Sequence, residues 1–94
     1  MRQARVERRL FDLSARLATA RHDLAVLEEQ TEVFEDSAED AKVRALVAED
    51  RSQVDADAGR HAEAMRRAST RLAASIAQME RTQEELISRL TSKL

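Results

Sequence analysis

Cysteine and proline are missing from this 94-residue sequence, and glycine occurs only once, at position 59. Without cysteine the chain has no disulfide, no thiolate metal site and no thiol nucleophile. Without proline and with a single glycine it has almost no residues suited to tight turns, which argues against β-hairpins. Two phenylalanines are the only Phe, Tyr or Trp residues, and 36% of the chain is charged. This composition is typical of long helices or coiled coils.

Long apolar runs are missing as well. No stretch approaches the roughly 18 apolar residues that are needed to span a bilayer. Residues 1–9 are rich in arginine and lack the apolar segment of a secretion signal. We therefore expect a single-domain, soluble, cytoplasmic protein that has no membrane partner.

A heptad pattern of apolar residues covers residues 6–34. Its core-type residues recur at alternating spacings of four and three, without a slip, over four repeats. They are Val6, Leu10, Leu13, Leu17, Ala20, Leu24, Leu27, Thr31 and Phe34. A helix with such a seam buries it against another helix, so this segment is predicted to be half of a coiled coil.

The acidic run at residues 35–40 contains signals for the start of a new helix. Ser37 is a suitable N-cap, and Asp40 follows it in a position similar to that of a capping box. We therefore predict a long helix over residues 2–35, then a turn, and then a short helix over residues 38–48.

A second boundary is predicted at residues 50–53, where Asp50 or Ser52 is placed to cap the next helix. The alternative is one bent helix that continues through this segment. The last helix is predicted over residues 52–92, and its own seam has the same alternating spacing. Its seam residues are Ala58, Ala62, Met65, Ser69, Leu72, Ile76, Met79, Gln83, Leu86 and Leu90. Gly59 is either tolerated near the start of this helix or marks a close approach of two backbones.

Two seams of this length predict an all-α fold, an antiparallel coiled-coil hairpin of two long helices with the short helix at its tip. The expected neighbours across the hairpin are Val6 with Leu90, Leu17 with Met79, and Phe34 with Ala62. Both termini then meet at one end of the hairpin.

The apolar surface is wider than a two-helix seam needs. With Leu10 at heptad position a, more apolar residues fall at positions b and c, and others lie outside the seam of the last helix. They are Phe11, Ala18, Ala25, Val26, Ala73, Ala77 and Ile87. Either the middle segment covers part of this face or a second copy does. A two-helix pair with so little aromatic volume is only marginally stable, which favours a homodimer in the form of a four-helix bundle.

Charge is distributed unevenly, although the net charge is only −2. Residues 1–21 carry +4 and residues 58–94 carry +3, whereas residues 28–57 carry −8. The predicted hairpin thus has a basic end and an acidic tip. The candidate partner-binding residues are Glu35, Asp36, Glu39 and Asp40 at the acidic tip, and Arg5, Arg8 and Arg9 at the basic end.

No catalytic, metal or cofactor motif is complete. His61 and Glu63 have the H-x-E spacing of zinc deaminases, whose paired cysteines are absent from this chain. Asp55 and Asp57 resemble the start of an EF-hand loop, but Gly59 comes one position early. We therefore predict no enzymatic activity, no metal and no cofactor.

Nucleic acid is not expected as a partner. The N-terminal arginines, with Arg89 and Lys93 across the hairpin, have the charge to contact phosphates. Tyrosine and tryptophan, which would stack on bases, do not occur. The pattern therefore favours a solvated helical face.

Three stretches of the sequence resemble small uncharacterised coiled-coil proteins of actinobacteria. They are ARVERRLFDLSARL at 4–17, EDAKVRALV at 39–47, and HAEAM at 61–65 together with QEELISRL at 83–90. The resemblance covers most of the chain and implies a helical hairpin. It carries over no functional residue, because that family has no assigned activity.

The predicted acidic tip is also similar to that of transcription factors that enter the secondary channel of RNA polymerase. Those factors use an antiparallel helical hairpin, and carboxylates on a thin rod can reach a metal ion deep in a channel. This chain departs from them by its inserted helix and by having no second globular domain. The sequence therefore predicts a non-enzymatic protein-interaction or regulatory module. The alternatives are a polymerase-channel factor that acts through the acidic tip, and a structural scaffolding coiled coil.

Overall fold

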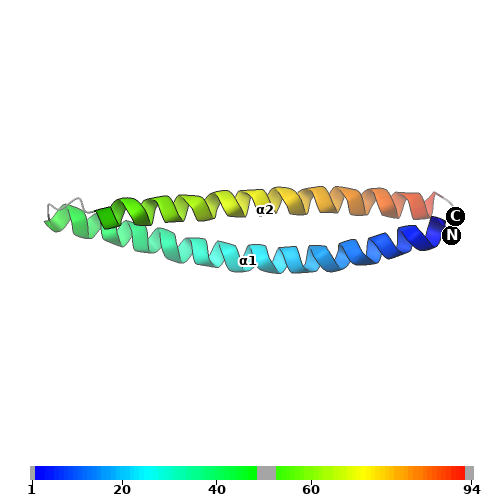
Figure 1. Ribbon diagram of the computed structural model, residues 1–94, viewed down its shortest axis with the longest axis horizontal. Coiled ribbons are helices and arrows are strands. Elements are labelled where there is room, and N and C mark those ends of the chain that lie inside the picture. Colours follow the sequence, from blue (N-terminus) through cyan, green and yellow to red (C-terminus); the bar gives the residue numbers. More distant parts are fainter. Residues whose placement is uncertain (1, 49–52, 93–94) are drawn as a thin grey trace. The chain divides into compact units, whose positions relative to one another are not determined.

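A computed structural model describes residues 2–48 and 53–92, and every described residue except Ser92 is α-helical. Helix α1 spans Arg2–Ala48 and helix α2 spans Gln53–Thr91 (Figure 1). The predicted all-α hairpin of two long helices is confirmed.

The last helix begins and ends within one residue of the predicted bounds. α2 starts at Gln53 and ends at Thr91, where residues 52 and 92 were expected. The predicted caps Asp50 and Ser52 lie outside the described residues.

The short helix predicted over residues 38–48 is not a separate helix, because α1 continues through residues 35–40 without a break. The reason lies in the seam, whose alternating spacing continues past Phe34 through three half-buried alanines. These are Ala38, Ala41 and Ala45. Alanine is the best helix former, and the polar residues between the alanines cost a few tenths of a kcal/mol each. The capping signals at Ser37 are therefore too weak to end the helix.

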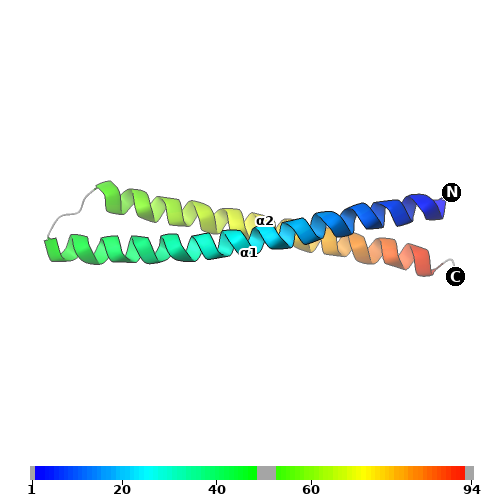
Figure 2. The ribbon, with the colours of Figure 1, turned by 90° about the horizontal axis from the view of Figure 1, so that it is seen from below.

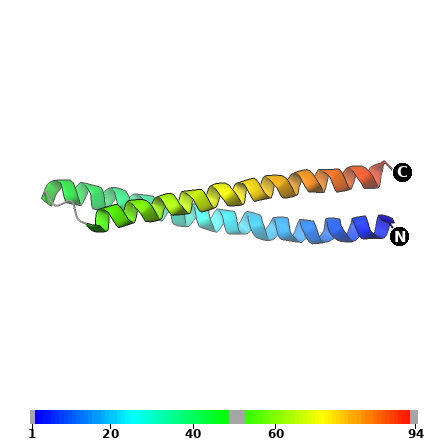
Figure 3. The ribbon, with the colours of Figure 1, turned by 45° about the horizontal axis from the view of Figure 1, so that its top comes forward.

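Two compact units make up the chain, and each contains one stretch of α1 and one stretch of α2. Unit 1 consists of Met1–Leu24 with Leu72–Leu94, and unit 2 consists of Ala25–Arg71. In unit 1 the first turns of α1 and the last turns of α2 lie side by side in three views (Figures 1, 2 and 3). In unit 2 the same views show the last turn of α1 lying beyond the first residue of α2.

The core of unit 1 consists of residues from both predicted seams. Its cluster contains buried Leu17, Ala20 and Ile76, with Leu24, Leu72 and Met79 packed around them. Leu17 exposes only 1% of its surface and Leu86 only 2%. The predicted neighbours Leu17 and Met79 thus share one cluster, as the antiparallel register requires.

Unit 2 has a thinner and more polar core. Its buried described residues are Thr31 and Ala62. The Thr31 hydroxyl donates a hydrogen bond of 2.7 Å to the carbonyl of Leu27, which satisfies it. Phe34 lies against His61, the residue next to its predicted neighbour, and keeps 39% of its surface exposed. Its predicted seam neighbour, Ala62, has only a methyl side chain, which is too small to cover the ring.

Gly59 lies inside α2 with open space around it. Beyond its own stretch of helix, a methyl group at its Cα would meet no described atom within 4 Å, so no described backbone of α1 approaches closely there. We expect Gly59→Ala to raise the free energy of unfolding by about 0.5–1 kcal/mol, because glycine loses more backbone entropy in a helix. Urea denaturation measures the change, and Ala64→Gly, at an exposed position of α2, should lower stability by a similar amount. A less stable Gly59→Ala variant would show that something packs on this position.

Candidate functional site

The four acidic residues predicted to form a tip lie inside α1, not at a turn. α1 continues for eight residues beyond Asp40, to Ala48. Glu35 and Glu39 line one groove of unit 2, of about 450 Å³, whereas Asp36 and Asp40 are exposed and are not among its lining residues. The prediction of an acidic tip is therefore corrected, and only two of its four residues come together in a groove.

This groove, which we name the charged groove, also contains cations. Its lining residues are Glu35, Ala38, Glu39, Lys42, Gly59, Ala62 and Arg66. Arg66 forms an ion pair with Glu35, with 3.3 Å between Nη1 and Oε1. Two carboxylates and two cations leave the charged groove without net charge. Sequence analysis missed Lys42 and Arg66, although extending the heptad through the alanines of α1 places Lys42 at the same position e as Glu35.

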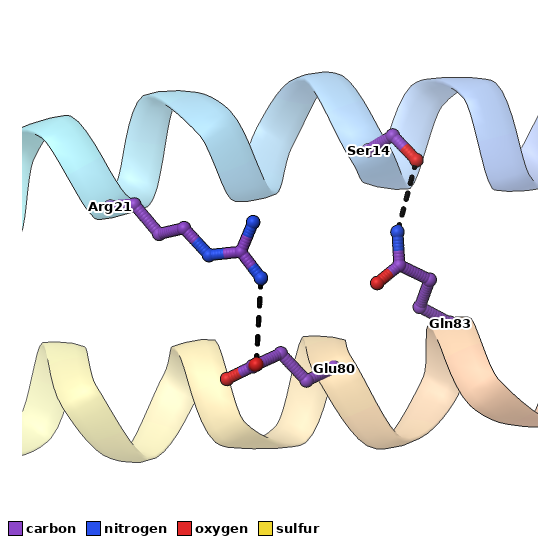
Figure 4. Close-up of polar contacts among 4 residues, drawn as sticks. All are labelled: Ser14, Arg21, Glu80 and Gln83. Carbon is purple, nitrogen blue, oxygen red and sulfur yellow. Dashed lines mark hydrogen bonds and ion pairs between the residues drawn. The ribbon is translucent and has the colours of Figure 1, made fainter.

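Ion pairs between the helices occur at heptad position e in both units. In unit 1, Arg21 of α1 pairs with Glu80 of α2 at 3.4 Å (Figure 4). In unit 2 the polarity is reversed, since Glu35 of α1 pairs with Arg66 of α2. These side chains are about half exposed, so each pair contributes at most ~1 kcal/mol. The pairs favour the antiparallel register rather than adding much stability.

A polar seam residue makes a second contact between the helices of unit 1, a hydrogen bond between neutral side chains. The Nε2 atom of Gln83 donates a hydrogen bond of 3.2 Å to the Ser14 hydroxyl oxygen across the helices (Figure 4). Gln83 is half-buried at a seam position that would otherwise hold an apolar side chain. A polar residue at such a position fixes the register at some cost in stability.

The three basic residues singled out by the sequence, Arg5, Arg8 and Arg9, are exposed on the first turns of α1 in unit 1. Arg89, in the last turn of α2, belongs to the same unit, whereas Lys93 lies outside the described residues. The sequence of unit 1 holds nine basic and six acidic residues, which gives +3. Unit 2 holds seven basic and twelve acidic residues, which gives −5. The two units therefore carry opposite net charges.

One ion pair within α2 shifts the pKa values of both of its side chains. A hydrogen bond from Arg67 to Glu63, together with the arginine charge, lowers the pKa of the Glu63 carboxyl and raises the pKa of the Arg67 guanidinium. Because the pKa of the Glu63 carboxyl is lower in the folded chain, this group stabilises the folded state at pH values above its pKa in the unfolded chain. That contribution is lost as the pH falls through the lower pKa of the folded chain.

A second groove of unit 2 is mostly apolar, and we name it the apolar groove. It has a volume of about 470 Å³ and is lined by Glu29, Gln30, Val33, Phe34, His61 and Met65. The rings of Phe34 and His61 meet there, with centroids 4.4 Å apart and an angle of 53° between their planes. Sequence analysis did not find this groove because it assigned Phe34 entirely to the seam.

Large apolar side chains are exposed in both units. They are Phe11 and Ile87 in unit 1, and Val26, Val33, Phe34, Val43, Leu46 and Val47 in unit 2. One explanation for the wide apolar face was that the middle segment covers it. Residues 38–48 are part of α1 itself, and a continuous helix cannot fold back over its own outer face. Residues 38–48 therefore do not cover the wide apolar face.

Neither a metal-binding cluster nor a membrane span is present in the part of the chain that the structure describes. Among the side chains that the structure describes, no group of three or more His, Asp or Glu residues is arranged to hold a metal ion. Neither α1 nor α2 has a stretch that is apolar and long enough to cross a bilayer.

Comparison with known proteins gives no match. No protein-family model, no curated protein and no solved structure matches this chain. The resemblance to actinobacterial coiled-coil proteins therefore stays a prediction. A proposal for the function has to start from the surfaces and charges of the two units.

Proposed function

We propose that this chain is a non-enzymatic coiled-coil interaction module that works as a homodimer. The observation that carries the proposal is the set of large apolar side chains that both units leave exposed among the described residues. A standard interface buries ~800 Å² on each partner, and a second copy on these faces would remove such side chains from water.

The kind of surface supports the same proposal. Among the described residues eight large apolar side chains are exposed, whereas only six apolar residues are buried. Val43, Leu46 and Val47 lie within little more than one turn of α1, on the side away from the half-buried alanines. Single exposed apolar residues are normal, but a set that outnumbers the core is typical of a helix pair with a partner.

Interaction with other proteins belongs to the same proposal. Units of opposite charge, +3 and −5, attract partners of the complementary sign and raise the rate of association. A role like that of the polymerase-channel factors required carboxylates at a protruding turn. Because residues 35–40 lie within α1, this alternative has no geometric support and we do not propose it.

Sedimentation equilibrium at micromolar concentration tests the proposal. We expect a mass twice that of the 10.6 kDa chain. The midpoint of thermal unfolding, followed by circular dichroism, should rise with protein concentration, because association stabilises the folded state by mass action. A monomer that unfolds cooperatively at a midpoint independent of concentration would contradict the proposal.

A further inference from the structure

We infer that Phe11 in unit 1 of a second copy inserts into the apolar groove in unit 2 of the first copy, and that the contact is made twice in the dimer. The inference rests on the proposed homodimer and identifies its interface. It goes further by naming one anchor residue and the groove that receives it.

Phe11 has the features of an anchor. It is one of only two phenylalanines in the chain, and 74% of its surface is exposed. It lies on the outer face of α1, at heptad position b, so burying it would not disturb the seam. Aromatic rings bring a large apolar area into an interface at a low cost in side-chain entropy, and they are frequent among residues that dominate binding energy.

The apolar groove has the lining that a phenylalanine ring requires. Phe34 and His61 already meet at 4.4 Å and leave much of the Phe34 surface open. Met65 lines the same groove, and its sulfur can contact an aromatic edge. Val33, which is 63% exposed, forms part of the wall. An inserted ring would complete a cluster of three rings with a thioether.

Charge favours the same docking. Arg8 precedes Phe11 by three residues, so it lies on the neighbouring turn of α1, and it is exposed. Glu29 lines the apolar groove and is also exposed. Inserting Phe11 therefore brings an arginine close to a glutamate at the rim. The net charges of the units, +3 for the donor and −5 for the acceptor, act in the same direction.

Two-fold symmetry explains why the contact is made twice. In a symmetric dimer each chain offers the same patch, so a residue that enters a groove of its partner is matched by the reciprocal contact. Phe11 and the apolar groove of each chain supply both halves. The dimer then contains two equivalent anchors.

Two variants, measured by sedimentation equilibrium with full-length protein, test the inference. Phe11→Ala removes both anchors and should raise the dissociation constant on the order of 1,000-fold. Val33→Glu places a carboxylate in the apolar groove and should raise it by at least about 100-fold. The added negative charge of this variant would strengthen a purely electrostatic attraction to unit 1, so a weaker dimer reports on the groove itself.

Matched controls are available in the same helix. Ser37→Glu places the same carboxylate in unit 2 at an exposed polar position that is not among the lining residues of the groove, and should alter the dissociation constant by less than about threefold. Thr19→Ala truncates an exposed polar side chain on the same stretch of α1 as Phe11 and should have an equally small effect. Unchanged helical circular dichroism shows that each variant folds.

Mixing the two variants distinguishes a reciprocal contact from an indirect effect. In a heterodimer of Phe11→Ala with Val33→Glu, one intact phenylalanine faces one intact groove, so the mixture should associate more tightly than either variant alone. Suppose that wild-type protein is dimeric. If both variants then dimerise as tightly as wild-type protein, or if the mixture associates no more tightly than the separate variants, the inference is overturned while the proposed function stands. If wild-type protein is monomeric, both are overturned.

Discussion

Replacing Leu17 by alanine is expected to lower the free energy of unfolding by about 3 kcal/mol, because large-to-small substitutions in a core cost about 2–5 kcal/mol. Leu17 exposes only 1% of its surface and lies in the cluster with Ala20 and Ile76. The seam between two helices is one layer of side chains, so few neighbours in the same chain can move in to fill the space. The loss is a large fraction of the ~5–15 kcal/mol that stabilises an ordinary domain.

Urea unfolding at a protein concentration well below the dissociation constant measures this loss, so that association does not contribute to the stability. Leu46→Ala removes the same atoms from a leucine that is 68% exposed, and it should change stability by no more than about 0.5 kcal/mol. Equal losses for the two leucines would mean that α1 faces α2 with a different side.

Replacing Ser69 by alanine is expected to have a large effect in the opposite direction, a gain of about 1–2 kcal/mol, which is the cost of a buried polar group without a hydrogen bond. The Ser69 hydroxyl oxygen is buried and forms no hydrogen bond among the described residues. It lies at a seam position of unit 2, in a groove that it shares with Thr31 and Arg66. Alanine removes the unpaired oxygen and leaves almost the same volume.

Ser75→Ala is the matched control for this gain. Ser75 is exposed on the same helix, so its replacement reports only the better helix propensity of alanine, a few tenths of a kcal/mol. The difference between the two variants measures the buried hydroxyl. Identical gains would show that Ser69 has a hydrogen-bond partner in solution.

The seam positions were predictable because they depend on spacing alone. Leu13, Leu17 and Ala20 are buried in α1, and Ala62, Ile76 and Leu86 are buried in α2, all at predicted positions. Side chains three and four residues apart share one face of a helix whatever lies around it. The pairing of Leu17 with Met79 followed from aligning the two seams in opposite directions.

The helix boundary near Ser37 was not predictable from local signals. A serine followed by an acidic residue three positions later is a capping pattern, but it ends a helix only where the helical alternative is weaker. Here Ala38 continues the seam, and Glu35 forms an ion pair with Arg66 of α2 that favours the helical register. This partner is more than thirty residues away along the chain, so a local pattern carries no information about it.

Composition and heptad spacing alone determined that this chain folds as two long antiparallel helices, which residues face inward, and that an apolar surface is left over. Only the tertiary structure decided that Arg66 of the other helix pairs with Glu35 of the acidic run, and that Phe34 lines an apolar groove in addition to its seam position. The physical reason is that helical periodicity fixes the direction of each side chain. The size and charge of what lies opposite depend on the second helix, and there Ala62 is too small to cover a ring and Arg66 is long enough to reach a carboxylate.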